Sequence, residues 1–181
     1  MQITGGYLKS RKIDSPKGDN VRPTLSQIRE SIFSALFSII DFENKTFLDL
    51  FAGSGIMGLE AISRGFETSC FVEKDKKTFF TLKSNCQKLN LTPEQTTIIL
   101  SESTKFLKKV GKSFDVIYID PPYQSGLYDT VLTEIIQNNI LKKNGIVIAE
   151  HSKDLVIDLN NYELIKQKTY ADKTITFLKQ K

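Results

Sequence analysis

Asp49-Leu50-Phe51-Ala52-Gly53-Ser54-Gly55-Ile56-Met57-Gly58 joins an apolar, strand-like stretch (46–51) to a helix-like stretch (57–64). Its three glycines have the spacing G-x-G-x-x-G, which lets the backbone approach a ligand at a helix N-terminus. A match of this kind is weak evidence when it stands alone. Its place between a strand and a helix makes it the expected start of a βαβ unit.

Strands and helices continue to alternate along the rest of the chain. This regular alternation is typical of a parallel sheet with helices on both faces and right-handed crossovers. The length of 181 residues suits one α/β domain, 1–181, with a Rossmann-like core over 46–181. We expect further strands over 69–72, 96–100, 114–119 and 145–150, helices over 76–89, 103–110 and 128–139, and a terminal hairpin over 163–169 and 174–178.

The first 41 residues form a basic extension and a helix before that core. Residues 2–13 are expected to form a strand or hairpin, and Thr24 with Gln27 forms a capping box for the helix. The apolar spacing of the helix predicts a polar face that presents Arg29 and Glu30. Residues 1–40 hold six lysines and arginines against three acids, or +3 of the total formal charge of +4. A basic arm suits a polyanionic partner, although charge alone favours an ordinary solvated surface.

Asp120-Pro121-Pro122-Tyr123 follows the apolar stretch 114–119, where a strand should end. The prolines fix φ and donate no N–H, so the turn is stiff and its carbonyl groups face outward. Asp120 and the Pro121 carbonyl can together accept both hydrogens of an exocyclic amine on a nucleobase, which leaves its lone pair free to attack an electrophile. Tyr123 can stack on a base taken out of its own stack. The pattern indicates methylation of a nucleobase amine, with a rigid turn after a buried strand as the plainer alternative.

The glycine-rich stretch can approach either a dinucleotide or the aminoacyl and ribose parts of S-adenosylmethionine. Asp49 is placed to face a cationic amino group, and Glu73, at the end of the next strand, is placed to accept from ribose hydroxyls. Glu73 suits both cofactors, but Asp120-Pro121-Pro122-Tyr123 has no use in hydride transfer. Both motifs fall at carboxyl ends of central strands, where open α/β sheets bind ligands. We therefore expect S-adenosylmethionine and a methyltransferase rather than a nicotinamide oxidoreductase.

The adenine end of the cofactor is harder to assign from the residues. Glu102 or Ser101 could contact the adenine amine, but Ser101 or Ser103 could equally be the N-cap of the next helix. Lys74 and Phe106 are candidates to flank the adenine, and core packing is the favoured role for Phe106. The cofactor-binding candidates are Asp49, Phe51, Ala52, Gly53, Ser54, Gly55, Gly58, Glu73, Lys74, Glu102 and Asp120.

The composition is that of a water-soluble globular protein. No stretch approaches the roughly 20 apolar residues of a membrane span, and the first 20 residues lack the apolar region of a signal peptide. Cys70, Cys86 and His151 are not spaced as a metal-ligand set, so we expect no metal. Reduced structural thiols in a cytoplasmic, monomeric protein are the expected state.

The chain resembles the bacterial 16S ribosomal RNA guanine-N2 methyltransferases, the ribosomal RNA small subunit methyltransferase D family. The resemblance extends over nearly the whole chain. It is carried by Ile3-Thr4-Gly5-Gly6-Tyr7-Leu8-Lys9-Ser10-Arg11-Lys12, Arg22-Pro23-Thr24, Arg29-Glu30-Ser31-Ile32-Phe33, the glycine-rich stretch, Glu73 and Asp120-Pro121-Pro122-Tyr123.

This resemblance implies a class I S-adenosylmethionine-dependent methyltransferase fold with a seven-stranded, mostly parallel sheet and a short N-terminal β/α extension. It also implies one guanine of 16S rRNA in the small ribosomal subunit as the target. Asp120, Pro121 and Tyr123 would then be the catalytic residues. Arg22 and Thr24 would close over the cofactor or the target nucleotide, unless they only cap the helix. Lys9, Arg11 and Lys12 would hold phosphates.

Three other functions compete with this one. A DNA adenine-N6 or cytosine-N4 methyltransferase carries the same four-residue turn, but a separate target-recognition domain does not fit in this length. A protein-glutamine methyltransferase usually has Asn at the position of Asp120. A ribosome-assembly factor that binds without catalysis could keep this fold, although an intact Asp120, Tyr123 and Gly53-Ser54-Gly55 argue against lost turnover.

Overall fold

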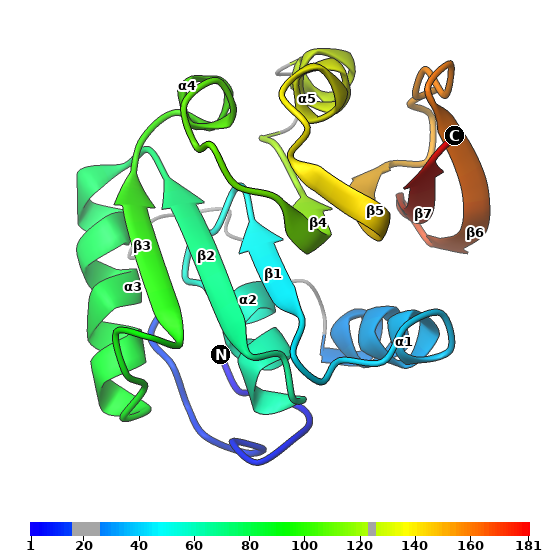
Figure 1. Cartoon of the computed structure of the whole chain (residues 1–181). Helices are drawn as coiled ribbons and strands as arrows, with labels where there is room; N and C mark the ends of the chain where they lie inside the picture. The colour runs from blue at the N-terminus through cyan, green and yellow to red at the C-terminus, as the bar shows by residue number, and fades with distance from the viewer. Residues whose placement is uncertain (16–25, 123–125) are drawn as a thin grey trace.

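The computed structural model describes residues 1–15, 26–122 and 126–181. Their centre is a seven-stranded sheet in the order β3-β2-β1-β4-β5-β7-β6 (Figure 1). Strands β1 to β5 pair in parallel, and β7 runs antiparallel to both β5 and β6. The strands are β1 (Thr46–Asp49), β2 (Thr68–Glu73), β3 (Thr96–Leu100), β4 (Phe114–Ile119), β5 (Leu141–Ser152), β6 (Tyr162–Tyr170) and β7 (Lys173–Gln180).

Helices cover both faces of this sheet, as the alternation predicts. One hydrophobic cluster joins one face to α1, α2 and α3, and a second joins the opposite face to α4 and α5 (Figure 1). The mixed seven-stranded sheet confirms the expected class I methyltransferase fold. The described helices are α1 (Ser26–Phe37), α2 (Ile56–Ser63), α3 (Lys76–Lys88), α4 (Ser103–Leu107) and α5 (Leu127–Gln137).

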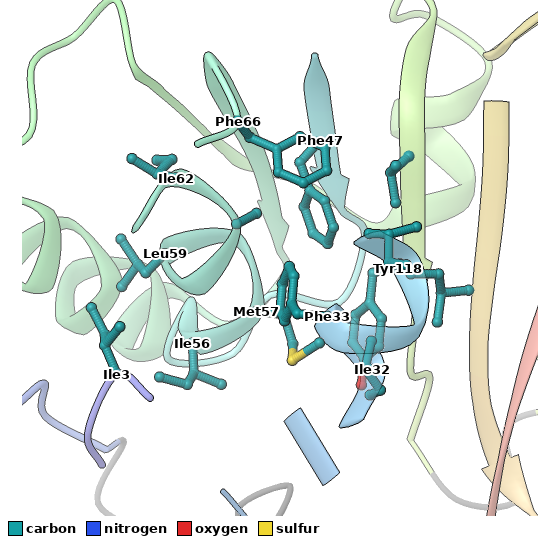
Figure 2. Close-up of a cluster of buried hydrophobic side chains, with 14 of the residues drawn as sticks. Ile3, Ile32, Phe33, Phe47, Ile56, Met57, Leu59, Ile62, Phe66 and Tyr118 are labelled. Carbon is teal, nitrogen blue, oxygen red and sulfur yellow. The ribbon is translucent and has the colours of Figure 1, made fainter. Parts of the chain in front are cut away.

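The apolar strands are buried on both faces, so successive side chains enter different cores. Phe47 of β1 packs under α1 and α2, whereas Leu48 belongs to the cluster under α4 and α5. Figure 2 shows Ile32 and Phe33 of α1 together with Met57 of α2 and Tyr118 of β4. Tyr118 therefore points to the same side of the sheet as α1.

Three details differ from the expectations. Residues 2–13 contain only one antiparallel bridge, Gln2 to Lys12, and not a hairpin of two strands. The strand predicted over 145–150 is longer, because β5 begins at Leu141 and ends at Ser152. Arg29 was expected on the polar face of its helix but is only 3% exposed.

The burial of Arg29 follows from a carboxylate on another helix. Glu60 of α2 is fully buried, and its oxygen lies 3.9 Å from the Arg29 side chain. The same carboxylate pairs with Arg64 at 2.8 Å and accepts hydrogen bonds from the backbone N–H and hydroxyl of Thr4. Arg29 also donates to the carbonyl of Gln2 at 2.7 Å. Glu60 thus fastens the N-terminal extension and α1 to α2.

Candidate active site

A cavity of about 790 Å³ opens at the carboxyl ends of the parallel strands. This size lies within the range of small-molecule sites, and the edge is where open α/β sheets bind ligands. The two sequence motifs both reach this one cavity. Its lining includes Phe51 after β1, Glu73 and Lys74 at the end of β2, Ser101 to Thr104 after β3, Asp120 to Pro122 after β4, Ser152 to Asp154 at the end of β5, and Asp172 and Lys173 at the start of β7.

The glycine-rich loop lies behind this cavity and turns sharply into α2. Gly53 and Gly55 have φ of +53° and +84°, a left-handed backbone conformation that residues other than glycine rarely adopt. Ala52, which precedes Gly53, and Ser54, which lies between the two glycines, are both buried. Gly58 has a packing role in addition, because a Cβ there would lie 2.3 Å from the ring of Phe71. The third glycine of the motif thus lets α2 approach β2 closely.

Glu73 is held in place by two backbone groups. Its Oε2 accepts from the N–H of Gly53 at 2.9 Å, and its Oε1 accepts from the N–H of Asp75 at 2.7 Å. The carboxylate therefore connects the glycine loop to the start of α3 and still lines the cavity. Each carboxylate oxygen has a second lone pair, which a ribose hydroxyl could use.

Asp49 provides a test of whether a cationic ligand fits. Its side chain is 1% exposed, and Oδ2 accepts from the N–H of Gly58 at 3.1 Å. Oδ1 is buried and makes no well-formed hydrogen bond to the described residues. Burial raises the pKa of Asp49 to about 7. A buried carboxyl oxygen without a donor, next to the glycine loop, fits the ammonium group of an amino-acid ligand.

At the adenine end, Glu102 rather than either serine occupies the N-cap position of α4. Glu102 lines the cavity and pairs with Lys105 at 3.0 Å. Lys74 is exposed and also lines the cavity. Phe106 is 8% exposed and packs in the core under α4 and α5, which was its favoured role.

Asp120 follows β4 directly and lies in the cavity wall with Pro121 and Pro122. Burial, and then the negative charges of Glu150 and Asp49, raise the pKa of Asp120 to about 7. The positive charge of Lys173 acts in the opposite direction. Sequence patterns had not singled out Glu150 or Lys173. In the sequence, each of them is marked only as a charged residue next to a stretch rich in β-branched residues.

The proposed nucleic-acid contacts lie elsewhere. Lys9, Arg11 and Lys12 are exposed, and the Arg11 guanidinium donates to the carbonyl of Lys88 at 2.9 Å. Lys88 ends α3, about 18 Å along that helix from its start beside Glu73. Contacts there would reach phosphates well away from the target base. Arg22, Thr24 and Tyr123 lie outside the described residues, so their roles stay predictions.

The two cysteines do not belong to a metal-ligand cluster of the described residues. Cys70 and Cys86 are free and buried, and burial raises the pKa of each thiol to about 11. Among the described residues, no group of three or more His, Cys, Asp or Glu side chains could hold a metal ion. No helix of the described chain is long and apolar enough to cross a membrane.

Comparison with known proteins agrees with this geometry. The family model described as "Conserved hypothetical protein 95" matches residues 1–179. Ribosomal RNA small subunit methyltransferase D of Buchnera aphidicola (Acyrthosiphon pisum) is 41% identical over 168 residues, which are 92% of this chain and 86% of that protein.

Two further comparisons extend this result. The protein of the same name from Haemophilus influenzae is 35% identical over 93% of this chain and 88% of its own length. The solved structure of the Escherichia coli protein yhhF superposes with a TM-score of 0.87 at 26% identity, covering 99% of this chain and 97% of that one. The chain therefore belongs to the ribosomal RNA small subunit methyltransferase D family.

Proposed function

We propose that this protein transfers a methyl group from S-adenosylmethionine to the exocyclic N2 amine of a guanine in the 16S rRNA of the small ribosomal subunit. The observation that carries this proposal is the shared cavity: Glu73 and Asp120-Pro121-Pro122 line one space at the same edge of the sheet. The names of the relatives support ribosomal RNA as the substrate. The N2 position rests on the acceptor pattern of the turn and on the family resemblance.

The residues divide between cofactor and acceptor. When bound, S-adenosylmethionine supplies a methyl group on a positively charged sulfur, which departs as a neutral thioether. Asp49 would face its ammonium group, Glu73 its ribose, and Glu102 or Lys74 its adenine. The glycine loop, Gly53-Ser54-Gly55 with the preceding Phe51 and Ala52, would contact the aminoacyl part of the cofactor.

Asp120 and the Pro121 carbonyl would hold the guanine amine so that its lone pair points at the methyl carbon. Held in this way, the amine nitrogen would take the methyl group that the bound cofactor supplies, and the surplus N–H proton would pass to Asp120 or to water. Because the ammonium formed is acidic, Asp120 acts mainly as an acceptor that orients the amine, and positioning supplies most of the acceleration. Tyr123 would stack on the extruded base.

The wider setting follows from the same proposal. Lys9, Arg11 and Lys12 would contact rRNA phosphates, and Arg22 and Thr24 would close over the cofactor or the nucleotide. We place the protein in the cytoplasm as a monomer, with residues 1–181 as one catalytic domain whose extension is 1–41 and whose core is 46–181. No metal takes part in this scheme.

The test is methyl transfer from labelled S-adenosylmethionine to small ribosomal subunits from cells that lack this gene, with free 16S rRNA and DNA as parallel acceptors. We expect label in subunit RNA, recovered as N2-methylguanine after digestion. Label only in DNA would replace the proposal with a DNA amino-methyltransferase. Cofactor binding without label in any acceptor would point to a non-catalytic assembly factor.

Asp120→Asn separates chemistry from binding in the same assay. The amide oxygen is neutral, so it accepts from the amine more weakly than a carboxylate and cannot take up the surplus proton, and we expect turnover to fall by about 100-fold or more. Cofactor affinity, measured by calorimetry, should stay within about threefold of the wild-type value. Turnover at the wild-type rate would overturn the role of Asp120.

A further inference from the structure

A group of charged and phenolic side chains lies on one face of the sheet beside Asp120. Residues two apart along a strand share a face, so Tyr118 and Asp120 project to the same side. Tyr118 pairs in register with Ile148, which places Glu150 opposite Asp120 one step further along both strands. Both Tyr118 and Ile148 belong to the core under α1. Glu150 therefore stands on the same side of the sheet as Asp120.

The Glu150 carboxylate is fully buried and both of its oxygens are engaged. The hydroxyl of Tyr118 donates to Oε2 at 2.5 Å. The ammonium of Lys173, from β7, forms an ion pair with Oε1. Burial and the Glu150 charge raise the pKa of Tyr118 well above its ordinary value, so the phenol stays a donor. The carboxylate is thus fixed from two strands.

Lys173 connects this buried group to the cavity. It is 9% exposed, and it lines the same cavity as Asp120. An apolar pair of similar volume is commonly as stable as a buried ion pair, so stability gives little reason for these charges. Their position beside the proposed amine acceptor gives a chemical reason.

We propose that Glu150 and Lys173 are positioning residues that act through Asp120. In this arrangement the Lys173 ammonium favours the ionised form of the neighbouring Asp120, against burial and the nearby carboxylates, and Glu150 holds that ammonium at the cavity wall. The inference rests on the proposed function, because the ionised carboxylate of Asp120 is the acceptor that, together with the Pro121 carbonyl, would hold the two hydrogens of the guanine amine.

Among the described charged groups that shift the pKa of Asp120, Lys173 is the one that lowers it. Burial and two carboxylates oppose ionisation of Asp120, and Lys173 opposes them. The ionisable groups nearest Asp120 lie on four strands: Asp49 on β1, Tyr118 on β4, Glu150 on β5 and Lys173 on β7. Further ionisable groups line the cavity, namely Glu73, Lys74, Glu102, Lys153, Asp154 and Asp172. The hydroxyl of Tyr128 on α5 donates to the Glu150 carbonyl.

Replacing Lys173 and replacing Glu150 should therefore shift the pKa of Asp120 in opposite directions. Lys173→Met removes the favourable charge, so the pKa of Asp120 should rise by about one unit. Glu150→Gln removes an unfavourable charge and frees the ammonium, so the pKa should fall. The double variant, which loses both charges, should titrate close to the wild type.

The experiment has two readouts. The first is the carboxyl carbon resonance of Asp120 by NMR between pH 4 and 9, assigned from its loss in Asp120→Asn and recorded without RNA. The second is the pH dependence of kcat on small subunits, whose acidic limb should move with the NMR titration. Lys179→Met, which removes the same charge from the same strand, is the matched control and should leave both unchanged.

Opposite shifts support the inference. Equal titrations in all variants, or shifts in the same direction, would overturn it, because a purely structural pair has no reason to move Asp120 in opposite directions. Where Lys173→Met does not fold, comparing Glu150→Gln with the double variant isolates the effect of Lys173. If the wild type methylates no RNA, the proposed function fails while the NMR titration still decides the coupling.

Discussion

At the scale of single residues, Asp120, the proposed amine acceptor, lies in an environment that opposes its ionised form. Its pKa of about 7 is far above the roughly 3.9 of a free aspartate. Folding therefore favours the protonated carboxyl. The stability gained this way is fully present below pH of about 4 and is lost as the pH rises through 7. Active sites commonly lower the stability of a protein in this way, because a buried charge that a reaction requires destabilises the folded state.

Asp120→Asn should accordingly make the protein more stable at alkaline pH. We expect the variant to exceed the wild type by about 1 kcal/mol in free energy of unfolding at pH 8, with the difference shrinking toward pH 5. Urea denaturation at pH 5, 6.5 and 8 measures this. Asp154→Asn, at an exposed carboxylate on the same cavity, is the control and should change little. A variant less stable than the wild type at pH 8 would contradict the argument.

At the scale of elements, Glu60 organises how the N-terminal extension and α1 meet α2. It accepts from Thr4, pairs with Arg64 and faces Arg29, although it is itself fully buried. Asn85 of α3 adds a second attachment. Its side chain bonds both the backbone of Asp14 and the carbonyl of Ser54 in the glycine loop. The extension is thus anchored to the two helices, α2 and α3, that contact the glycine loop.

Glu60→Gln should destabilise the protein by about 3 kcal/mol, because Arg29 and Arg64 lose their shared counter-charge in a buried setting. Urea denaturation at pH 7 measures the loss. Limited proteolysis should show cleavage within residues 1–15 in the variant before the core is cut. The exposed Glu67→Gln is the matched control, with an expected change within about 0.5 kcal/mol. Equal stability of the two variants would show that Glu60 is not an anchor.

At the scale of the whole molecule, the proposed catalytic cavity and the exposed basic residues of the extension occupy different places. The cavity lies at the carboxyl edge of the sheet, whereas Arg11 is bonded to the far end of α3. A large, folded RNA can reach both at once, and a short oligonucleotide cannot. This separation favours a structured RNA as the substrate over an isolated nucleotide.

Replacing Lys9, Arg11 and Lys12 together with Gln should weaken binding of small-subunit RNA and lower its salt dependence. Each lost phosphate contact lowers the slope of log K against log salt by about 0.7 to 0.9, so we expect a decrease of about 2. Filter binding between 50 and 300 mM salt measures it. Replacing Lys143, Lys166 and Lys179 removes the same charge from the β5–β7 side and should leave the slope nearly unchanged. If the two triple variants behave alike, the extension holds no phosphates.

Local patterns were sufficient for most elements. The strand and helix periods placed β3 and β4 at their observed bounds and the remaining elements within a few residues, because burial on one or both faces leaves a readable spacing. The glycine-rich loop and the Asp120-Pro121-Pro122 turn could also be predicted from the sequence. Each depends on a backbone geometry that only certain residues adopt.

Other features depended on contacts between residues far apart in the chain. Nothing near Arg29 in the sequence predicted its burial, since its counter-charge is 31 residues away on α2. The pairing of Glu150 with Tyr118 and Lys173 required the order β4-β5-β7 and its register. The sequence by itself determined the elements and the motif chemistry, because these are local. Only the tertiary structure decided which charges surround Asp120, because strand order brings distant residues together.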